Sequence, residues 1–183
     1  MACRLLPTMN PLLSELSCDH FGIKAKRLLL PIDLAKCPLE IFPLANAFTK
    51  PFEGAITVLH VFDRRRNVAP RRASETELRR AEQHLKRIGD DYLSPTVEAF
   101  FRVRIGIPGD EILAEAKATN VDLVLLPRFV SSVWRRLAGY AYGETTRNLV
   151  RDASCRVFVV DVRTRFNCFR RWARKEDCIL CTT

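Results

Sequence analysis

The sequence predicts an α/β fold in which an open parallel sheet is covered by helices on both faces. Short apolar runs without alternation, such as Leu28–Ile32 and Val121–Leu126, are typical of strands that are buried on both faces. Helical patterns separate these runs, so that strand and helix alternate along the chain. Alternation of this kind requires right-handed crossovers, which make the strands parallel and place helices on both sides of the sheet.

Size and composition fit one globular domain. The chain has 183 residues, of which 48% are hydrophobic and 28% charged. No apolar run reaches the roughly 18 residues of a membrane-spanning helix, and the first residues lack the long apolar segment of a signal peptide. We therefore expect a cytoplasmic protein with an N-terminal leader (1–23), a domain (24–162) and a basic, cysteine-containing tail (163–183). The seven cysteines are expected to be mostly free thiols in a reducing compartment.

The first strand lies in the stretch Lys26–Asp33. Pro31 fits only near the end of a strand, because proline donates no ladder hydrogen bond. Asp33 then falls at the carboxyl end, where open α/β sheets bind ligands; a cap on the next helix is an equal alternative. In that helix Pro38 suits the first turn, whereas Pro43 predicts a kink or a late start. The expected core face comprises Leu39, Phe42, Ala45 (or Asn46) and Phe48.

The second strand, Ala55–Phe62, is rich in β-branched residues and contains His60, for which a core role is favoured over catalysis. An arginine-rich loop, 63–72, follows it. The next helix opens with the capping box Ser74–Glu77, in which the hydroxyl and the carboxylate satisfy exposed backbone amides. Its apolar stripe recurs at three- and four-residue steps and comprises Leu78, Ala81, Leu85, Ile88 and Tyr92.

The third strand, Val97–Ile105, alternates apolar residues with Arg102 and Arg104, a pattern that predicts an edge strand with one wetter face. The remaining expected elements, in chain order, are a helix over Asp110–Thr119, a strand over Val121–Leu126, a loop over Pro127–Tyr142, a helix over Glu144–Ala153 and a strand over Arg156–Val160.

Five pieces, in this order and spacing, resemble the universal stress protein family. They are Pro31-Ile32-Asp33, Leu59-His60-Val61, Gly106-Ile107-Pro108 with Ile112-Leu113, Val121–Leu126 and Leu149–Val160. The resemblance covers Lys26–Val162 and implies a Rossmann-like sheet of five parallel strands in the order 3-2-1-4-5, with dimers joined largely through the last strand. It also implies, for many members, an ATP site. There an Asp after strand one reads base and ribose, and a glycine loop after strand four, closed by Ser or Thr, holds the phosphates.

The chain keeps the Asp and departs from the loop. Pro127 and Val130 stand at the first two glycine positions. Proline has no backbone amide to offer a phosphate, and the branched side chain of valine keeps its backbone away from one. Gly143 matches the third glycine, but Glu144 follows it and the spacing is three residues too long. An alignment on Arg135–Gly139 nearly restores the spacing but places Tyr140 after the glycine. The site positions under this resemblance are Pro31, Asp33, Pro127, Val130, Gly143, Thr145 and Thr146.

Glu144 is expected to repel a triphosphate, a repulsion that Arg128, Arg135 and Arg136 of the loop would offset in part. The favoured interpretation is an ordinary helix start, in which Glu144 answers the helix dipole and Thr145 or Thr146 helps to cap. No cofactor is therefore firmly expected, and ATP binding is expected to be weak or absent.

The tail carries two further patterns. Cys178–Cys181 is a C-x-x-C pair near the terminus, without the second pair or histidines of a zinc site. Between Arg163 and Lys175, basic residues alternate with Phe166, Phe169 and Trp172, which suits single-stranded nucleic acid or an anionic membrane. Docking of this aromatic row on the domain or on a partner is favoured instead.

No Ser-His-Asp set, Cys-His set or carboxylate pair points to an enzyme. We expect a regulatory, homodimeric stress protein joined through Arg156–Val160, with a protein partner that the sequence does not identify. Two alternatives stay open. One is a nucleotide switch that uses the crevice between Asp33 and Gly143; the other is a basic protein that associates with RNA or membranes.

Overall fold

The computed structural model describes residues 25–36, 39–65, 74–129 and 143–162. Its centre is a parallel sheet in the order β3-β2-β1-β4-β5, which confirms the predicted fold class. The strands are β1 (Arg27–Pro31), β2 (Ala55–Asp63), β3 (Glu98–Gly106), β4 (Leu123–Phe129) and β5 (Arg156–Val162). The leader, the loop residues 66–73 and 130–142 and the tail lie outside the described residues.

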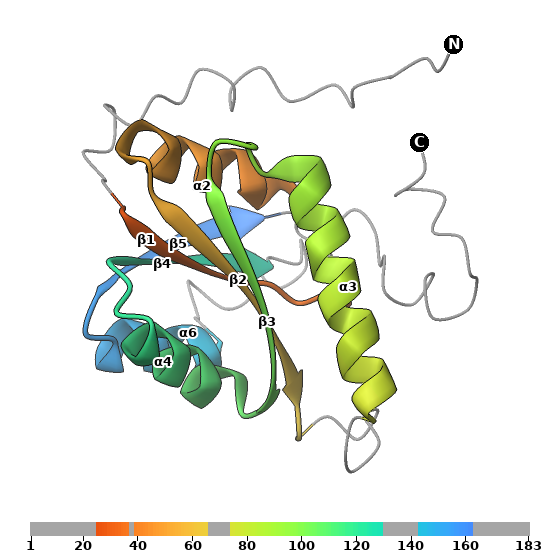
Figure 1. Ribbon diagram of the computed structural model, residues 1–183. Coiled ribbons are helices and arrows are strands. Elements are labelled where there is room, and N and C mark those ends of the chain that lie inside the picture. The colour runs from red at the N-terminus through yellow and green to blue at the C-terminus, as the bar shows by residue number, and fades with distance from the viewer. Residues whose placement is uncertain (1–24, 37–38, 66–73, 130–142, 163–183) are drawn as a thin grey trace.

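Helices cover both faces of the sheet, as Figure 1 shows. On one face lie α2 (Phe42–Thr49) and α3 (Glu75–Tyr92), and on the other lie α4 (Pro108–Ala118) and α6 (Glu144–Asp152). Two short 3-10 turns, η2 (Leu39–Ile41) and η3 (Lys50–Phe52), flank α2. The three layers follow from strands that are apolar on both sides and therefore need cover on both sides.

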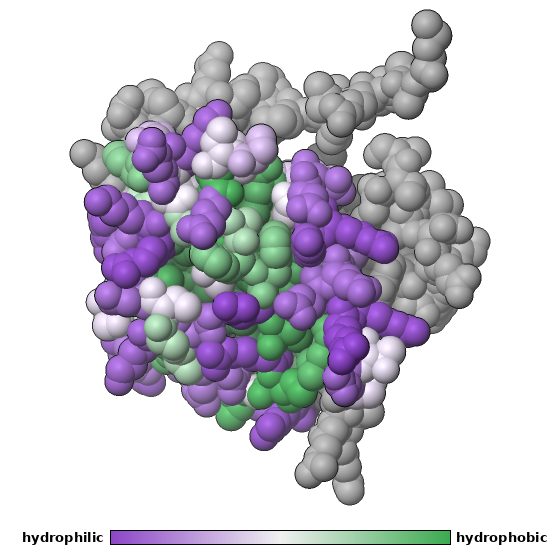
Figure 2. Space-filling view, in the orientation of Figure 1, coloured by the Kyte–Doolittle hydropathy of each residue, from purple (hydrophilic) through white to green (hydrophobic). Residues whose placement is uncertain are grey.

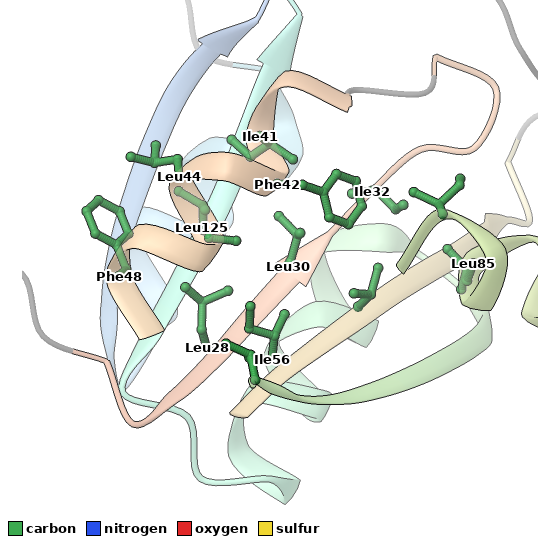
Figure 3. Packing of buried hydrophobic residues seen from close by; sticks show 14 of the residues in the cluster. Leu28, Leu30, Ile32, Ile41, Phe42, Leu44, Phe48, Ile56, Leu85 and Leu125 are labelled. Atoms are coloured by element: carbon green, nitrogen blue, oxygen red, sulfur yellow. The ribbon is translucent and has the colours of Figure 1, made fainter. Parts of the chain in front are cut away.

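The core has two halves because side chains along β1 point alternately to opposite faces. Leu28 and Leu30 are fully buried on the side of α2 and α3, and Figure 3 shows them pointing toward α2. Phe48 of α2 packs edge-on against Phe158 of β5, with ring centroids 5.5 Å apart. Leu29 is fully buried on the opposite side, against α4 and α6.

The helix predictions are confirmed where capping and proline fix the start. Ser74 Oγ accepts from the Glu77 amide, and Glu77 Oε2 accepts from the Ser74 amide at 2.7 Å, which is a full capping box. The late start predicted from Pro43 is also found, because η2 precedes α2 and Pro43 lies in the first turn of the latter. The helix expected from Asp110 begins two residues earlier, at Pro108, because proline suits the first helical position.

The histidine and edge-strand predictions are confirmed as well. His60 is buried within β2, and β3 is an edge strand whose apolar and arginine side chains alternate. Figure 2 shows hydrophilic side chains along α3 and a hydrophobic strip beside it, over the region of β2 and β3. Phe100 of β3, 40% exposed, belongs to the face of that strand that α4 leaves partly uncovered.

The join between β1 and β4 is short. β2 and β3 are paired at nine positions and β4 and β5 at seven, but β1 and β4 only at Leu28↔Leu123 and Leu29↔Val124. Asp122 reinforces this join, because its Oδ2 accepts from the amides of Lys26 at 3.0 Å and Arg27 at 2.9 Å. A carboxylate thus supports the point where the two halves of the sheet meet.

Candidate functional site

The expected binding region lies where the strand order reverses, between β1 and β4. The β1–β2 ladder continues to Pro31↔Leu59, and the Ile32 amide still donates to the Leu59 carbonyl at 2.8 Å. The β1–β4 ladder has ended by then, at Val124. Asp33 follows β1 at this switch point, which is where open α/β sheets bind ligands.

Asp33 organises a turn there. Its Oδ1 accepts from the Ala35 amide at 3.0 Å, and its carbonyl accepts from the Lys36 amide at 2.8 Å. The Lys36 ammonium lies 3.7 Å from Oδ2. This is a side-chain-closed turn of the kind that Asp favours. Among the described residues the next helical element is η2, from Leu39, so Asp33 closes a turn ahead of it.

His60 lies beneath this turn as a structural residue. Its Nδ1 is 3.1 Å from the Ile32 carbonyl oxygen and therefore carries the hydrogen, since a carbonyl only accepts. The ring meets Phe62 edge-on at 4.8 Å. Burial lowers the pKa of His60, although the hydrogen bond to Ile32 and the charge of Asp33 oppose this. The predicted core role for His60 is confirmed.

The expected loop does not begin at Pro127. That residue lies within β4, paired with Val160, and the strand continues to Phe129. The prediction of a loop from Pro127 is wrong because pairing with β5 prolongs the strand past the point where β1 has left it. Pro127 is tolerated there, since proline is accepted where a strand lacks a neighbour on one side. Val130 lies outside the described residues.

The start of α6 is simpler than the predicted cap. Gly143 is the N-cap at φ −60° and ψ 160°, so Thr145 and Thr146 lie inside the first turn rather than at the cap position. Thr146 is instead buried, at 7% exposure. At this φ any residue is allowed, and an added Cβ on Gly143 would meet nothing within 4 Å among the described residues. The glycine therefore fulfils no conformational need in this structure.

One contact at the switch point was not predicted. Arg65, the second residue after β2, places Nη1 2.7 Å from Oε2 of Glu144, the first residue of α6. The same guanidinium contacts Asp63, with Nε 3.2 Å from Oδ1. The sequence showed an arginine-rich loop and an acidic helix start, but nothing in their spacing indicates that the two meet across 79 positions.

The described part of the chain contains no group of three or more His, Cys, Asp or Glu residues that could hold a metal ion. None of its helices is long and apolar enough to cross a membrane. A shallow hollow lies at the opposite, amino-terminal end of the sheet, lined by side chains of both charges together with Thr57 and Phe100. Its mixed lining indicates no particular ligand.

Solved structures support the fold. The hypothetical protein MJ0577 is 22% identical, with 74% of this chain and 95% of that chain covered and a TM-score of 0.57. The protein UspA from Lactobacillus plantarum is 21% identical, with 75% and 98% covered and a TM-score of 0.56. A universal stress protein solved in complex with cAMP is 16% identical, with 75% and 98% covered and a TM-score of 0.50.

A search of the curated proteins gave no match. The sequence profile of the Universal stress protein family, by contrast, matches residues 24–161, which is most of the chain. The strand order found in the structure is the one expected for this family. The chain therefore belongs to the universal stress protein family.

Proposed function

We propose that this universal stress protein is a regulatory module of the cytoplasm that works as a homodimer joined through β5, without a catalytic step of its own. The observation that carries the proposal is the free edge of β5. This strand is last in the sheet and pairs only with β4 among the described residues. Its centre, Val157–Val160, is apolar and half-buried. An apolar strand edge of this length invites pairing with another chain.

The backbone of β5 identifies the groups that a partner strand would meet. The Arg156 amide donates to the Asp122 carbonyl at 3.3 Å, so it faces the neighbouring strand. Successive residues of a strand direct their amides to opposite sides. The amides of Phe158 and Val160 therefore face β4, and those of Val157 and Val159 face the free edge.

Light scattering on the purified full chain tests the dimer, together with hydrogen exchange at two protein concentrations. We expect a dimer mass and protection of the Val157 and Val159 amides that disappears on dilution. Exchange at Phe158 and Val160 should not depend on concentration, because β4 already protects these amides. A monomer mass at every concentration would refute the proposal.

A second candidate function is weak adenine-nucleotide binding at the switch point. Asp33 supports it by its place after β1, as does the relative solved with cAMP. Three carboxylates in this region, Asp33, Asp63 and Glu144, oppose an anionic ligand. With no glycine at position 127 to bring a backbone amide to the phosphates, we expect a dissociation constant in the high micromolar range or above, about 5 kcal/mol of binding free energy or less.

Calorimetric titration with ATP tests this second function. Asp33→Ala should abolish the weak binding, and the control Asp91→Ala, on the exposed end of α3, should leave it unchanged. Purified protein should retain no nucleotide by its absorbance ratio. Tight binding would contradict the expectation, and equal binding by both variants would place the ligand elsewhere.

A further inference from the structure

The Arg65–Glu144 ion pair crosses the switch point. Arg65 follows β2, and Glu144 begins α6, the helix after β4. Because β2 and β4 flank β1 in the sheet, a contact between these two residues passes over the carboxyl end of β1. Asp33 stands at that end, so a ligand of Asp33 that extended over β1 toward α6 would meet the ion pair.

The arginine of the pair is held from behind by Asp63. The Arg65 amide donates to Asp63 Oδ1 at 2.9 Å, and its guanidinium contacts the same carboxylate. Hydrogen bonds with Asp63 and then with Glu144 raise the pKa of Arg65. The first turn of α6 places the backbone of Glu144, while its side chain is 62% exposed. The guanidinium is therefore oriented toward the helix start, whereas the carboxylate is open to solvent.

The carboxylate of Glu144 stands where an anion would otherwise be attracted. The start of α6 carries exposed amides and the positive end of the helix dipole, and Gly143 offers no side chain to satisfy them. Glu144 supplies a negative charge at this end, and the same carboxylate neutralises Arg65, a cation at the region's rim. One side chain thus places its charge at the helix end and pairs with Arg65, the two features that would favour a phosphate.

The contact is nevertheless easily opened. The side chains of Arg65 and Glu144 are 41% and 62% exposed, and exposed ion pairs contribute little to stability. A stronger competitor for Arg65, with more negative charge than one carboxylate, can take its place.

We propose that the Arg65–Glu144 ion pair is an autoinhibitory contact, in which Glu144 holds the anion position and a nucleotide phosphate binds by displacing it and pairing with Arg65. This inference rests on the proposed nucleotide binding at Asp33. It attributes the expected low affinity for ATP to the presence of Glu144 in the anion position as well as to the missing glycines. Arg65 then pairs with Glu144 in the free protein and with a phosphate in the nucleotide-bound protein.

Calorimetry with ATP on four full-length forms tests the inference. These are the wild type, Glu144→Gln, Arg65→Gln and the double variant; Glu75→Gln is a matched control, because Glu75 also forms an exposed ion pair with an arginine, Arg79, at the start of a helix. Glu144→Gln should tighten binding by at least about threefold, the size of a charge effect at a helix end. Glu75→Gln should leave the affinity unchanged. Arg65→Gln should weaken binding, and by a larger factor in the Glu144→Gln background, where Asp63 is the one described carboxylate that still pairs with Arg65.

The outcomes separate the two proposals. If the wild type binds ATP and Glu144→Gln binds no tighter, the autoinhibitory contact is wrong and nucleotide binding stands. If Arg65→Gln tightens binding as Glu144→Gln does, Arg65 is no phosphate partner and the exchange of partners is refuted. If no form binds, Glu144→Gln included, both the contact and nucleotide binding fail. Circular dichroism should show all forms folded, since the pair is exposed.

Discussion

The free edge of β5 leads to a contrast between two neighbouring substitutions, Val159→Pro and Val160→Pro. Proline removes one amide in each case. The amide of Val159 faces the free edge and that of Val160 faces β4, as the bond from Arg156 to Asp122 establishes. Proline is accepted on an edge strand where its nitrogen faces outward and is excluded where a ladder bond is needed.

The magnitudes follow from the number of bonds lost. In a symmetric dimer Val159→Pro removes one donor from each protomer, or two hydrogen bonds at about 0.5–1.5 kcal/mol each. The loss of about 1–3 kcal/mol weakens the dimer by about fivefold to 150-fold. Val160→Pro leaves a buried acceptor of β4 without its donor, at about 1–3 kcal/mol within each protomer, and should lower the melting temperature by about 2–4 °C per kcal/mol.

Analytical ultracentrifugation and thermal unfolding separate the two effects. Val159→Pro should dissociate the dimer with little change in the melting temperature extrapolated to low concentration, while Val160→Pro should lower that temperature. Val159→Ala and Val160→Ala control for the loss of side-chain volume, because both side chains pack against the core. If Val159→Pro leaves the dimer intact, the interface lies elsewhere on the molecule.

Three further predictions concern stability. Arg104→Met leaves Glu115, 3% exposed, without the guanidinium that binds it at 2.7 Å. Chemical denaturation should show a loss of about 3 kcal/mol in the free energy of unfolding, which Glu115→Leu restores in the double variant. Additive losses in the double variant would refute this coupling. Gly89→Ala places a Cβ against the ring of Phe101 and should cost about 1–3 kcal/mol, relieved by Phe101→Leu. Because burial lowers the pKa of His60 in the folded state, the unfolded chain takes up the proton first. The free energy of unfolding should therefore be greatest above about pH 6.5 and fall below it. If the melting temperature of His60→Gln falls as steeply with decreasing pH, another group causes the effect.

Much of the fold is readable from local pattern. The capping box at Ser74 needs only residues three apart, and the start of α2 needs only the φ restriction of Pro43. The edge position of β3 follows from alternation within one strand. Each of these features is decided by residues close together in sequence.

The site was less predictable because its decisive features depend on distant partners. Pro127 ends an apolar run and looks like the start of a loop, but β5 extends the strand beyond it. Arg65 is one of several neighbouring arginines, and only the folded sheet selects it for Glu144. The buried Glu115 was missed for the same reason, since its partner Arg104 lies on another element.

The short join between β1 and β4 has a consequence for how the protein opens. The described residues before Ile107 build the β3-β2-β1 half, and those after it build the β4-β5 half. With two paired positions between them, against nine and seven within the halves, the backbone ladder is weakest at this join, and side-chain packing such as Phe48 on Phe158 holds the halves together. We therefore expect native-state exchange of the strand amides to be fastest at this join, which Asp122 reinforces. A ligand that contacts both Asp33 and α6 would then slow exchange at the join.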